Sequence, residues 1–313
     1  MDLKAKLLDP GQTVLLYGTT PPRLGTPPDQ VEAAADKLAA RLSGLPLDGV
    51  AVYDIQDETG RTQHPRPFPF AGTVDPRSYS ALLQARTGRP AIAYKALGNL
   101  DEALWNAWLF DSAHAHRLRF VSVVGRPTSG VRYALSLARA IRIAAEHVAG
   151  FTVGGVAIAE RHGAQRSEAA RLLAKGIEGC GYFISQTVYQ APPTQQLLAD
   201  YLRDCRGAGV EPRRVVLTFA PCGREKTLAF IRWLGVNVSR DTERAILGAS
   251  SPLAKSIEIC RDNLRRILER PYAGEIPLGV NVESVSINRD EIDASIDLFH
   301  ALREVLNEAG SSP

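Results

Sequence analysis

The stretch from 179 to 189 reads Gly179-Cys180-Gly181-Tyr182-Phe183-Ile184-Ser185-Gln186-Thr187-Val188-Tyr189, an apolar strand that ends in polar residues. Residues 182–184 suit a buried strand, whereas the amide of Gln186 gains nothing from burial unless it has a partner. In a repeat of strands and helices, ligands are bound at the carboxyl ends of the strands. Gln186 is therefore a candidate site residue, and the alternative is an ordinary turn or capping glutamine.

The rest of the chain repeats this alternation of short apolar runs and longer amphipathic segments. Strands are predicted over 13–17, 50–55, 90–94, 120–125, 153–158, 182–186, 215–219 and 278–282. Helices are predicted over 28–42, 103–115, 131–148, 168–177, 194–205, 225–234, 240–247, 252–269 and 289–308. Mostly continuous apolar strands, each followed by a helix, indicate parallel pairing. The predicted fold class is α/β, a (β/α)8 TIM barrel that forms a single domain over residues 1–313.

Composition excludes several classes of protein. Hydrophobic residues make up 45% of the 313 residues and charged residues 23%, so the chain can bury a large core. A net charge of +3 is small for a nucleic-acid-binding surface. Without a signal-like N-terminus or an apolar run of membrane-spanning length, we expect a cytoplasmic protein with neither nucleic-acid nor membrane partners. The scattered cysteines and histidines form no CxxC or HExxH pattern, so no metal is expected.

Several segments match one family in the order in which they occur. They are GTTPPR at 18–23, GVAIAERH at 155–162, LAKG at 173–176, ISQ at 184–186 and SINRDE at 286–291. Together they span most of the chain, and they resemble the methylenetetrahydrofolate reductases. The resemblance implies that FAD binds along the carboxyl face of the barrel, with NAD(P)H as co-substrate. It also implies reduction of 5,10-methylenetetrahydrofolate to 5-methyltetrahydrofolate, a step of methionine biosynthesis, by a homo-oligomer.

Carried over position by position, the resemblance assigns candidate site residues. Those near the flavin would be Tyr94, Gly125, Arg126, Tyr133, Ala134, Ala157, His162, Glu168 and Lys175. Those near the folate would be Gln186, Tyr189, Phe219 and Arg289. Tyr94 stands where the family has a histidine, and Arg126 where it has an aspartate. Read without the family, Lys175 and Glu168 would be an ordinary solvated helix face and His162 a turn residue.

The chain departs from the family at the catalytic acid. Gly18 stands where the family has its proton-donating glutamate, and opening the bridged carbon of the folate requires a proton. Asp54 is the favoured replacement, because it follows an apolar run at the carboxyl end of a strand, where burial favours the acid form. If Tyr53 points into the barrel, however, Asp54 points toward the helices, and Glu283 becomes the better candidate.

Two other functions remain open at this point. A flavin-free enzyme would transfer hydride directly from NADH to the folate, as the changes at Tyr94 and Arg126 suggest. A barrel that binds flavin or pterin without turnover would be consistent with the loss of the family acid at Gly18.

Overall fold

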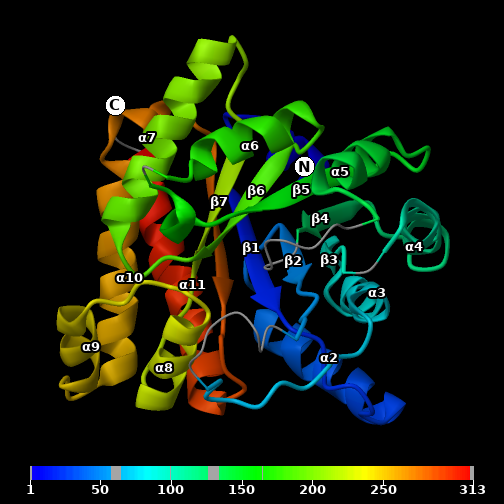
Figure 1. The fold of residues 1–313 in the computed structure, drawn as a ribbon. Coiled ribbons are helices and arrows are strands. Elements are labelled where there is room, and N and C mark those ends of the chain that lie inside the picture. The colour runs from blue at the N-terminus through cyan, green and yellow to red at the C-terminus, as the bar shows by residue number, and fades with distance from the viewer. Residues whose placement is uncertain (1, 58–64, 99, 126–133, 164, 311–313) are drawn as a thin grey trace.

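The short apolar runs form parallel strands that close into a barrel in chain order, from β1 to β8 (Figure 1). The computed structural model describes residues 2–57, 65–98, 100–125, 134–163 and 165–310. The strands are β1 (Val14–Thr19), β2 (Gly49–Val52), β3 (Ala91–Ala96), β4 (Phe120–Val124), β5 (Thr152–Ala157), β6 (Tyr182–Thr187), β7 (Arg214–Phe219) and β8 (Leu278–Glu283). Each predicted strand is present within a few residues of its predicted bounds.

Helices surround the barrel on its outside (Figure 1). They are α1 (Leu3–Leu8), α2 (Pro28–Leu42), α3 (Pro76–Thr87), α4 (Glu102–His114), α5 (Leu137–Glu146), α6 (Glu168–Ile177), α7 (Ala191–Ala208), α8 (Glu225–Trp233), α9 (Arg240–Leu247), α10 (Pro252–Leu268) and α11 (Arg289–Gly310). Short 3-10 helices cover η2 (Ala159–Arg161) and η3 (Pro271–Gly274). The predicted (β/α)8 fold is confirmed.

Two helices were not predicted, and one begins later than predicted. α1 precedes the barrel, and α3 fills the connection between β2 and β3, where the Asp75 side chain accepts a hydrogen bond from the backbone N–H of Arg77. The prediction of a helix from residue 131 is wrong in its described part, because residues 134–136 are not helical and α5 begins at Leu137. Ser136 sets this start by accepting a hydrogen bond from the backbone N–H of Arg139 at 3.2 Å.

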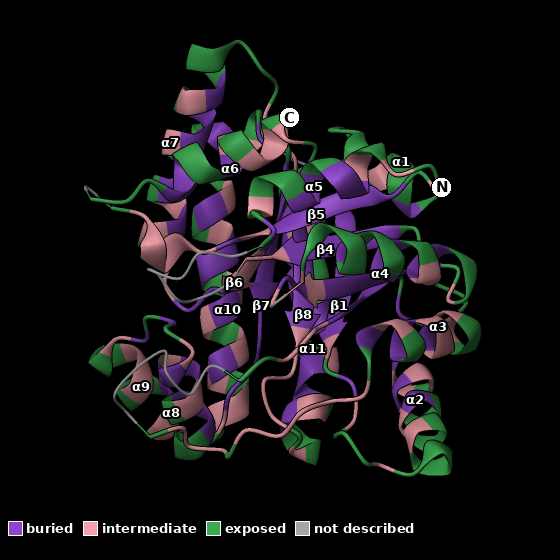
Figure 2. Ribbon diagram, turned by 45° about the vertical axis from the view of Figure 1, so that its right-hand side comes forward, coloured by how far each residue is buried: buried purple, intermediate pink, exposed green. Residues whose placement is uncertain are grey.

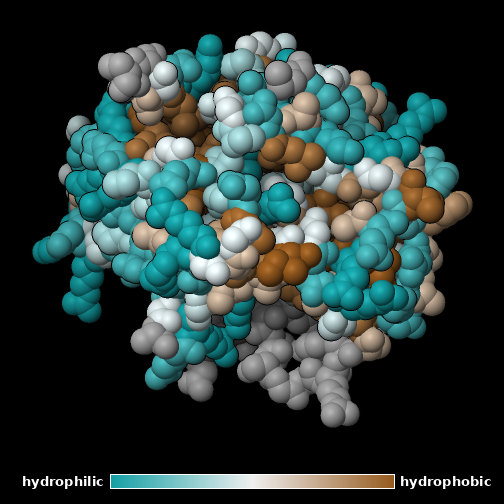
Figure 3. Space-filling model, turned by 90° about the horizontal axis from the view of Figure 1, so that it is seen from above, coloured by the Kyte–Doolittle hydropathy of each residue, from teal (hydrophilic) through white to brown (hydrophobic). Residues whose placement is uncertain are grey.

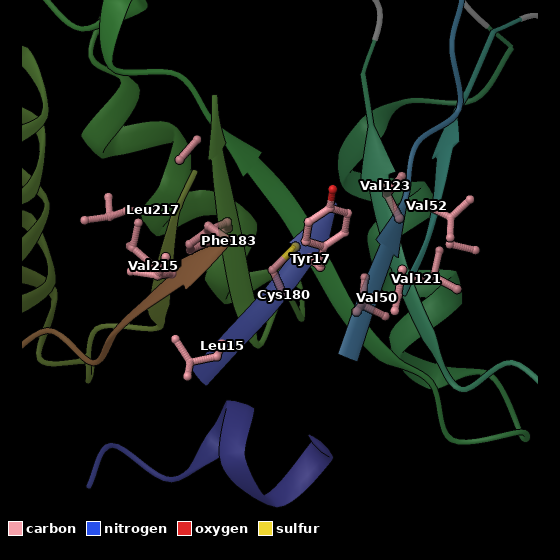
Figure 4. Packing of buried hydrophobic residues seen from close by; sticks show 14 of the residues in the cluster. Leu15, Tyr17, Val50, Val52, Val121, Val123, Cys180, Phe183, Val215 and Leu217 are labelled. Carbon is pink, nitrogen blue, oxygen red and sulfur yellow. The ribbon is translucent and has the colours of Figure 1, made fainter. Parts of the chain in front are cut away.

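Alternation along the strands divides the buried residues into two cores. Residues such as Leu15, Val50 and Leu217 point outward and pack under the helices (Figure 4). Their sequence neighbours, such as Leu16 and Val216, point inward and fill the barrel. Figure 2 shows the result, with buried strands at the centre and the exposed residues of the helices on their outer faces.

The amino end of the barrel is plugged. Leu3 and Leu7 of α1 pack against the inner core. The buried guanidinium of Arg214 donates hydrogen bonds to the carbonyl groups of Leu7, Asp9 and Leu278. These bonds satisfy backbone acceptors that would otherwise be buried without partners. A ligand therefore has access from the carboxyl end.

The surface seen from above in Figure 3 is mostly hydrophilic, with hydrophobic residues in separate patches. Among the described residues, no helix combines the length and the apolar character needed to cross a membrane.

Candidate functional site

A cleft of about 760 Å³ lies at the carboxyl ends of the strands. This volume is within the range of sites for cofactors and drug-sized ligands. Its floor comes from residues at strand ends, among them Thr20, Tyr53, Tyr94, Val124, Val156, Gln186, Thr187 and Glu283. Its walls come from α5, α6 and α8, through residues such as Leu137, Ile141, Glu168, Arg171, Lys175, Phe230 and Trp233. The cleft therefore combines apolar walls with charged groups at separate places.

Glu283 at the end of β8 lies in the barrel mouth and lines the cleft. Its Oε1 accepts a hydrogen bond from Thr187 Oγ1 at 2.9 Å, and its carboxyl group is also hydrogen-bonded to Tyr53. Burial raises the pKa of Glu283, and the two hydrogen bonds lower it by less. A buried carboxyl group with a raised pKa is suited to hold a proton for transfer.

Tyr53 occupies the space beside Gly18. A Cβ atom placed on Gly18 would lie 2.2 Å from the Tyr53 hydroxyl oxygen, which is closer than any real contact. The Tyr53 ring packs edge-on against Tyr94, with ring centroids 4.8 Å apart. Its hydroxyl accepts a hydrogen bond from Asn281 Nδ2 at 2.9 Å. Tyr53 therefore points into the barrel, which is the condition under which Glu283 becomes the better candidate acid.

Asp54 also lines the cleft, but its carboxylate serves the structure of the mouth. It accepts hydrogen bonds from the backbone N–H of Ala96 at 3.0 Å and from Gln56 Nε2 at 2.8 Å. Lys95 Nζ lies 3.3 Å from its Oδ2. Both carboxylate oxygens of Asp54 thus already have partners within the chain, Gln56 on Oδ1 and the backbone N–H of Ala96 with Lys95 on Oδ2.

A group of cations lies on the opposite side of the cleft, on and near α6. Lys175 Nζ donates a hydrogen bond to the carbonyl group of Val156 at 2.6 Å and lies 3.7 Å from Glu168 Oε1. Arg171 pairs with the other oxygen of Glu168 at 3.4 Å, and Arg161 lines the same part of the cleft. Burial lowers the pKa of Lys175 despite the attraction of Glu168. A bound anion would therefore stabilise the charge of this lysine.

The wall near α8 is aromatic. The Arg66 guanidinium lies over the rings of Phe230 and Trp233, at 5.0 Å and 5.1 Å from their centroids. Gln186 Nε2 donates a hydrogen bond to the carbonyl group of Leu234 at 2.7 Å, just beyond the end of α8. This bond holds the Gln186 amide at the rim between Glu283 and the aromatic wall.

The cleft brings together part of the residue set predicted from the sequence. It is lined by Asp54, Tyr94, Gly125, Glu168, Lys175, Gln186 and Glu283. Arg126 and Tyr133 lie outside the described residues. The other predicted residues do not line the cleft: Ala134, Ala157, His162, Tyr189, Phe219 and Arg289.

These remaining residues have structural surroundings of their own. His162 Nε2 pairs with Asp200 Oδ2 at 2.8 Å, which joins the turn after η2 to α7. Tyr189 is buried and donates a hydrogen bond to the carbonyl group of Ala220 at 2.7 Å, and Phe219 lies in the outer core. Arg289 is exposed and pairs with Asp293 at 3.5 Å. Ala134 is exposed and precedes α5, and Ala157 is buried in the outer core.

Sequence reasoning assigned no role to Tyr53, Thr187 or Asn281, which surround Glu283 or support its partners. The sequence contains one signal for each of them. Tyr53 follows an apolar strand, Thr187 ends one, and Asn281 is a polar residue inside a strand pattern. Which of these residues meet depends on the order and stagger of the strands around the barrel. In that register, Gly18 lies beside Glu283.

We expect Gly18→Ala to destabilise the fold, because its methyl group would overlap the Tyr53 hydroxyl. The free energy of unfolding should fall by about 1–3 kcal/mol, the usual cost of overpacking a core. Urea unfolding of the variant and the wild type measures the difference. Gly207→Ala is a matched control, because a Cβ there meets nothing within 4 Å. Equal stability of the two variants would show that the Gly18 site has room for a side chain.

No protein-family model matches the chain, and a search of curated proteins finds no match. Among solved structures, the chain is similar to an uncharacterized protein from Clostridium thermocellum that binds two copies of 5-methyl-5,6,7,8-tetrahydrofolic acid. The two chains are 29% identical, with a TM-score of 0.80 over 97% of this chain and 99% of that one. A 2,3-dimethylmalate lyase of the PEP mutase/isocitrate lyase superfamily is 12% identical, with a TM-score of 0.49 over 98% of this chain and 85% of that one. The similarity to this lyase is too low to support an argument about function.

The fold and the site thus define a (β/α)8 barrel with a large cleft at the carboxyl ends of its strands. In particular, it is similar over nearly its whole length to a barrel that binds methyltetrahydrofolate.

Proposed function

We propose that this protein binds a reduced folate in the cleft and reduces 5,10-methylenetetrahydrofolate to 5-methyltetrahydrofolate with NAD(P)H. The observation that carries the proposal is the similarity, over 97% of the chain, to a barrel that binds the product of this reaction. The cleft adds a protonatable carboxyl group at Glu283 and an amide at Gln186, both at strand ends that line it. Fold alone would support no reaction, because TIM barrels host many chemistries.

The proposed reaction needs one proton and one hydride. The proton goes to the bridging nitrogen of the folate that leaves, N10, and the bond between the methylene carbon and this nitrogen breaks with its electron pair remaining on the nitrogen. A hydride then adds to the resulting iminium carbon and gives the methyl group, while NAD(P)H is oxidised to NAD(P)⁺. General acid catalysis of this kind is typically worth about 10²–10⁴ in rate.

We assign the proton to Glu283. Its pKa is raised by burial, and it lies at the floor of the cleft beside the position of Gly18. Asp54, by contrast, is engaged by the backbone N–H of Ala96 and by Lys95. Gln186 would orient the pterin from the rim.

FAD is the cofactor that we propose for the cleft. Lys175, Arg171 and Arg161 would hold its diphosphate, and the bound diphosphate would add to the attraction of Glu168 in stabilising the charge of Lys175. Apolar residues such as Val124 and Ile141 would flank its ring system. When bound, FAD would relay hydride from NAD(P)H to the folate. The chain itself would supply orientation, exclusion of water and the proton.

A second candidate function is direct hydride transfer from the dinucleotide to the folate, without flavin. The group of cations on and near α6 favours it, because these cations would equally hold the diphosphate of NAD(P)H. A visible spectrum of the purified protein, with FAD titrated back into it, separates the two candidates. A yellow or FAD-binding protein supports the flavin route, whereas a colourless protein that is active without added FAD supports direct transfer. Failure to oxidise NAD(P)H in the presence of methylenetetrahydrofolate, with or without FAD, would leave a binding protein.

We expect Lys175→Ala to weaken FAD binding by about tenfold to a hundredfold, since a hydrogen bond to a charged group contributes roughly 1.5–3 kcal/mol. Activity should return at high added FAD, and wild-type affinity should decrease as salt is raised. Fluorescence titration of FAD measures the change. Lys4→Ala, which removes an exposed lysine of α1 at the opposite end of the barrel, is the control. Unchanged FAD affinity in Lys175→Ala would exclude this lysine from the flavin site.

A further inference from the structure

We propose that Tyr53 is a positioning residue that holds Glu283 in the geometry of a proton donor. Gly18 is required because any side chain there would displace the Tyr53 phenol. This inference rests on the proposed function and extends it to a residue on a different strand.

The first observation is steric. The Gly18 position faces the inside of the barrel, next to Glu283 on the neighbouring strand β8. The space that a side chain of residue 18 would need is filled by the Tyr53 hydroxyl group, 2.2 Å from the position of a Cβ atom. A phenol from the end of β2 thus replaces whatever group β1 would otherwise present to the barrel mouth.

The second observation is the direction of the hydrogen bonds. Asn281 Nδ2 donates to the Tyr53 hydroxyl oxygen at 2.9 Å, so the phenol directs its own proton toward the Glu283 carboxyl group. Thr187 Oγ1 donates to Oε1 of the same carboxyl group at 2.9 Å. Two hydroxyl donors from opposite sides of the mouth therefore fix the plane of the carboxyl group. Fixing a catalytic group in this way is how a supporting residue contributes to rate.

The third observation concerns the groups that face Glu283. The titratable groups that act on it or respond to it from the surrounding elements are tyrosines: Tyr17 of β1, Tyr53 after β2, Tyr94 of β3 and Tyr189 after β6. Burial raises the pKa of each of them, so all are neutral in the range in which Glu283 titrates. In the described part of the chain, the charged groups of the cleft are Asp54, Arg66, Arg161, Glu168, Arg171, Lys175 and Glu178, and none of them contributes to the pKa shift of Glu283. Burial is therefore the influence that raises the pKa of Glu283, and the hydrogen bonds of Tyr53 and Thr187 are those that lower it.

The test is the pH profile of kcat/KM for NAD(P)H oxidation with methylenetetrahydrofolate. In the wild type, activity should decline as pH rises through the pKa of Glu283. Tyr53→Phe keeps the ring but removes a hydrogen bond that lowers this pKa, so the decline should move to higher pH. We also expect kcat to fall about twofold to tenfold, the usual worth of one hydrogen bond to an uncharged group, because Glu283 acts in its protonated form. In Glu283→Gln, this limb of the profile should be absent.

The matched control is Tyr182→Phe. Tyr182 lies inside the barrel, and its ring fills the space over Gly154, where a Cβ atom would lie 2.3 Å from the ring. Its hydroxyl group pairs with Ser122 at 3.4 Å, and it does not line the cleft. This variant removes a buried phenol in the same kind of glycine–tyrosine contact, so its pH profile should match the wild type.

A second readout needs no turnover. Because the pKa of Glu283 is raised in the folded state, the folded protein holds the proton between the unfolded and the folded pKa, and stability falls as pH rises through that window. In Tyr53→Phe this fall should extend to higher pH, and in Glu283→Gln it should disappear. Urea unfolding at a series of pH values measures it.

The two readouts separate the possible failures. An unshifted profile and an unshifted stability curve in Tyr53→Phe would overturn the positioning role. A wild type without turnover, combined with a shifted stability curve in Tyr53→Phe, would overturn the proposed reaction and support the pairing of Tyr53 with Glu283. Equal shifts in Tyr53→Phe and Tyr182→Phe would overturn the assignment to Tyr53, because the effect would then belong to any buried phenol.

Discussion

Glu283→Gln should slow reduction of methylenetetrahydrofolate by at least ~100-fold, the usual worth of general acid catalysis. The amide keeps the size of the side chain and an oxygen that accepts the hydrogen bond from Thr187, but it cannot donate a proton as an acid. Binding of 5-methyltetrahydrofolate should change little, because N10 of the product already carries its proton and binding requires no proton transfer from residue 283. Steady-state oxidation of NAD(P)H and equilibrium titration of the folate measure the two quantities.

Asp54→Asn is the informative comparison for this prediction. It removes the other candidate acid, whose carboxylate is held by the backbone N–H of Ala96 and by Lys95. We expect this variant to lose stability in the barrel mouth but to keep the decline of activity at high pH that we assign to Glu283. If reduction of methylenetetrahydrofolate slows by ~100-fold in Asp54→Asn and not in Glu283→Gln, the proton donor is Asp54. If neither does, water reaching the mouth of the barrel is the donor.

Gln186→Ala should raise the KM for folate by about tenfold to a hundredfold, the range expected for a lost buried hydrogen bond of roughly 1–3 kcal/mol. Its amide nitrogen is already committed to the carbonyl group of Leu234, so a pterin N–H would be accepted by the amide oxygen. Direct titration with 5-methyltetrahydrofolate checks that the change in KM is a change in binding.

Gln190→Ala is the matched control, because it removes the same kind of side chain from a position that does not line the cleft. FAD content should stay at the wild-type level in both variants. A Gln186→Ala protein that loses FAD while keeping its folate affinity would reverse the assignment of this residue from substrate to cofactor.

The barrel and much of its cleft could be predicted from the sequence because their signals are local. A run such as 215–219 identifies a strand by its apolar, β-branched composition, and its position in the chain sets its place in a parallel barrel. The same logic places Gln186 and Glu283 at strand ends, and therefore at the mouth, before any contact is known. Carry-over from the family also named Tyr189, Phe219 and Arg289, which do not line the cleft, because matching a position says nothing about whether the side chain turns toward it.

The sequence by itself determined the order of strands and helices, the end of the barrel at which the cleft lies, and the absence of a side chain at Gly18. Only the tertiary structure decided what fills that space. Tyr53 and Asn281 are 228 residues apart, and their hydrogen bond depends on the closure of β1 onto β8 and the stagger of the strands. The physical reason is the difference in range. Alternation and helical period are set by neighbouring residues, whereas the meeting of Gly18, Tyr53 and Glu283 is set by packing around the whole barrel.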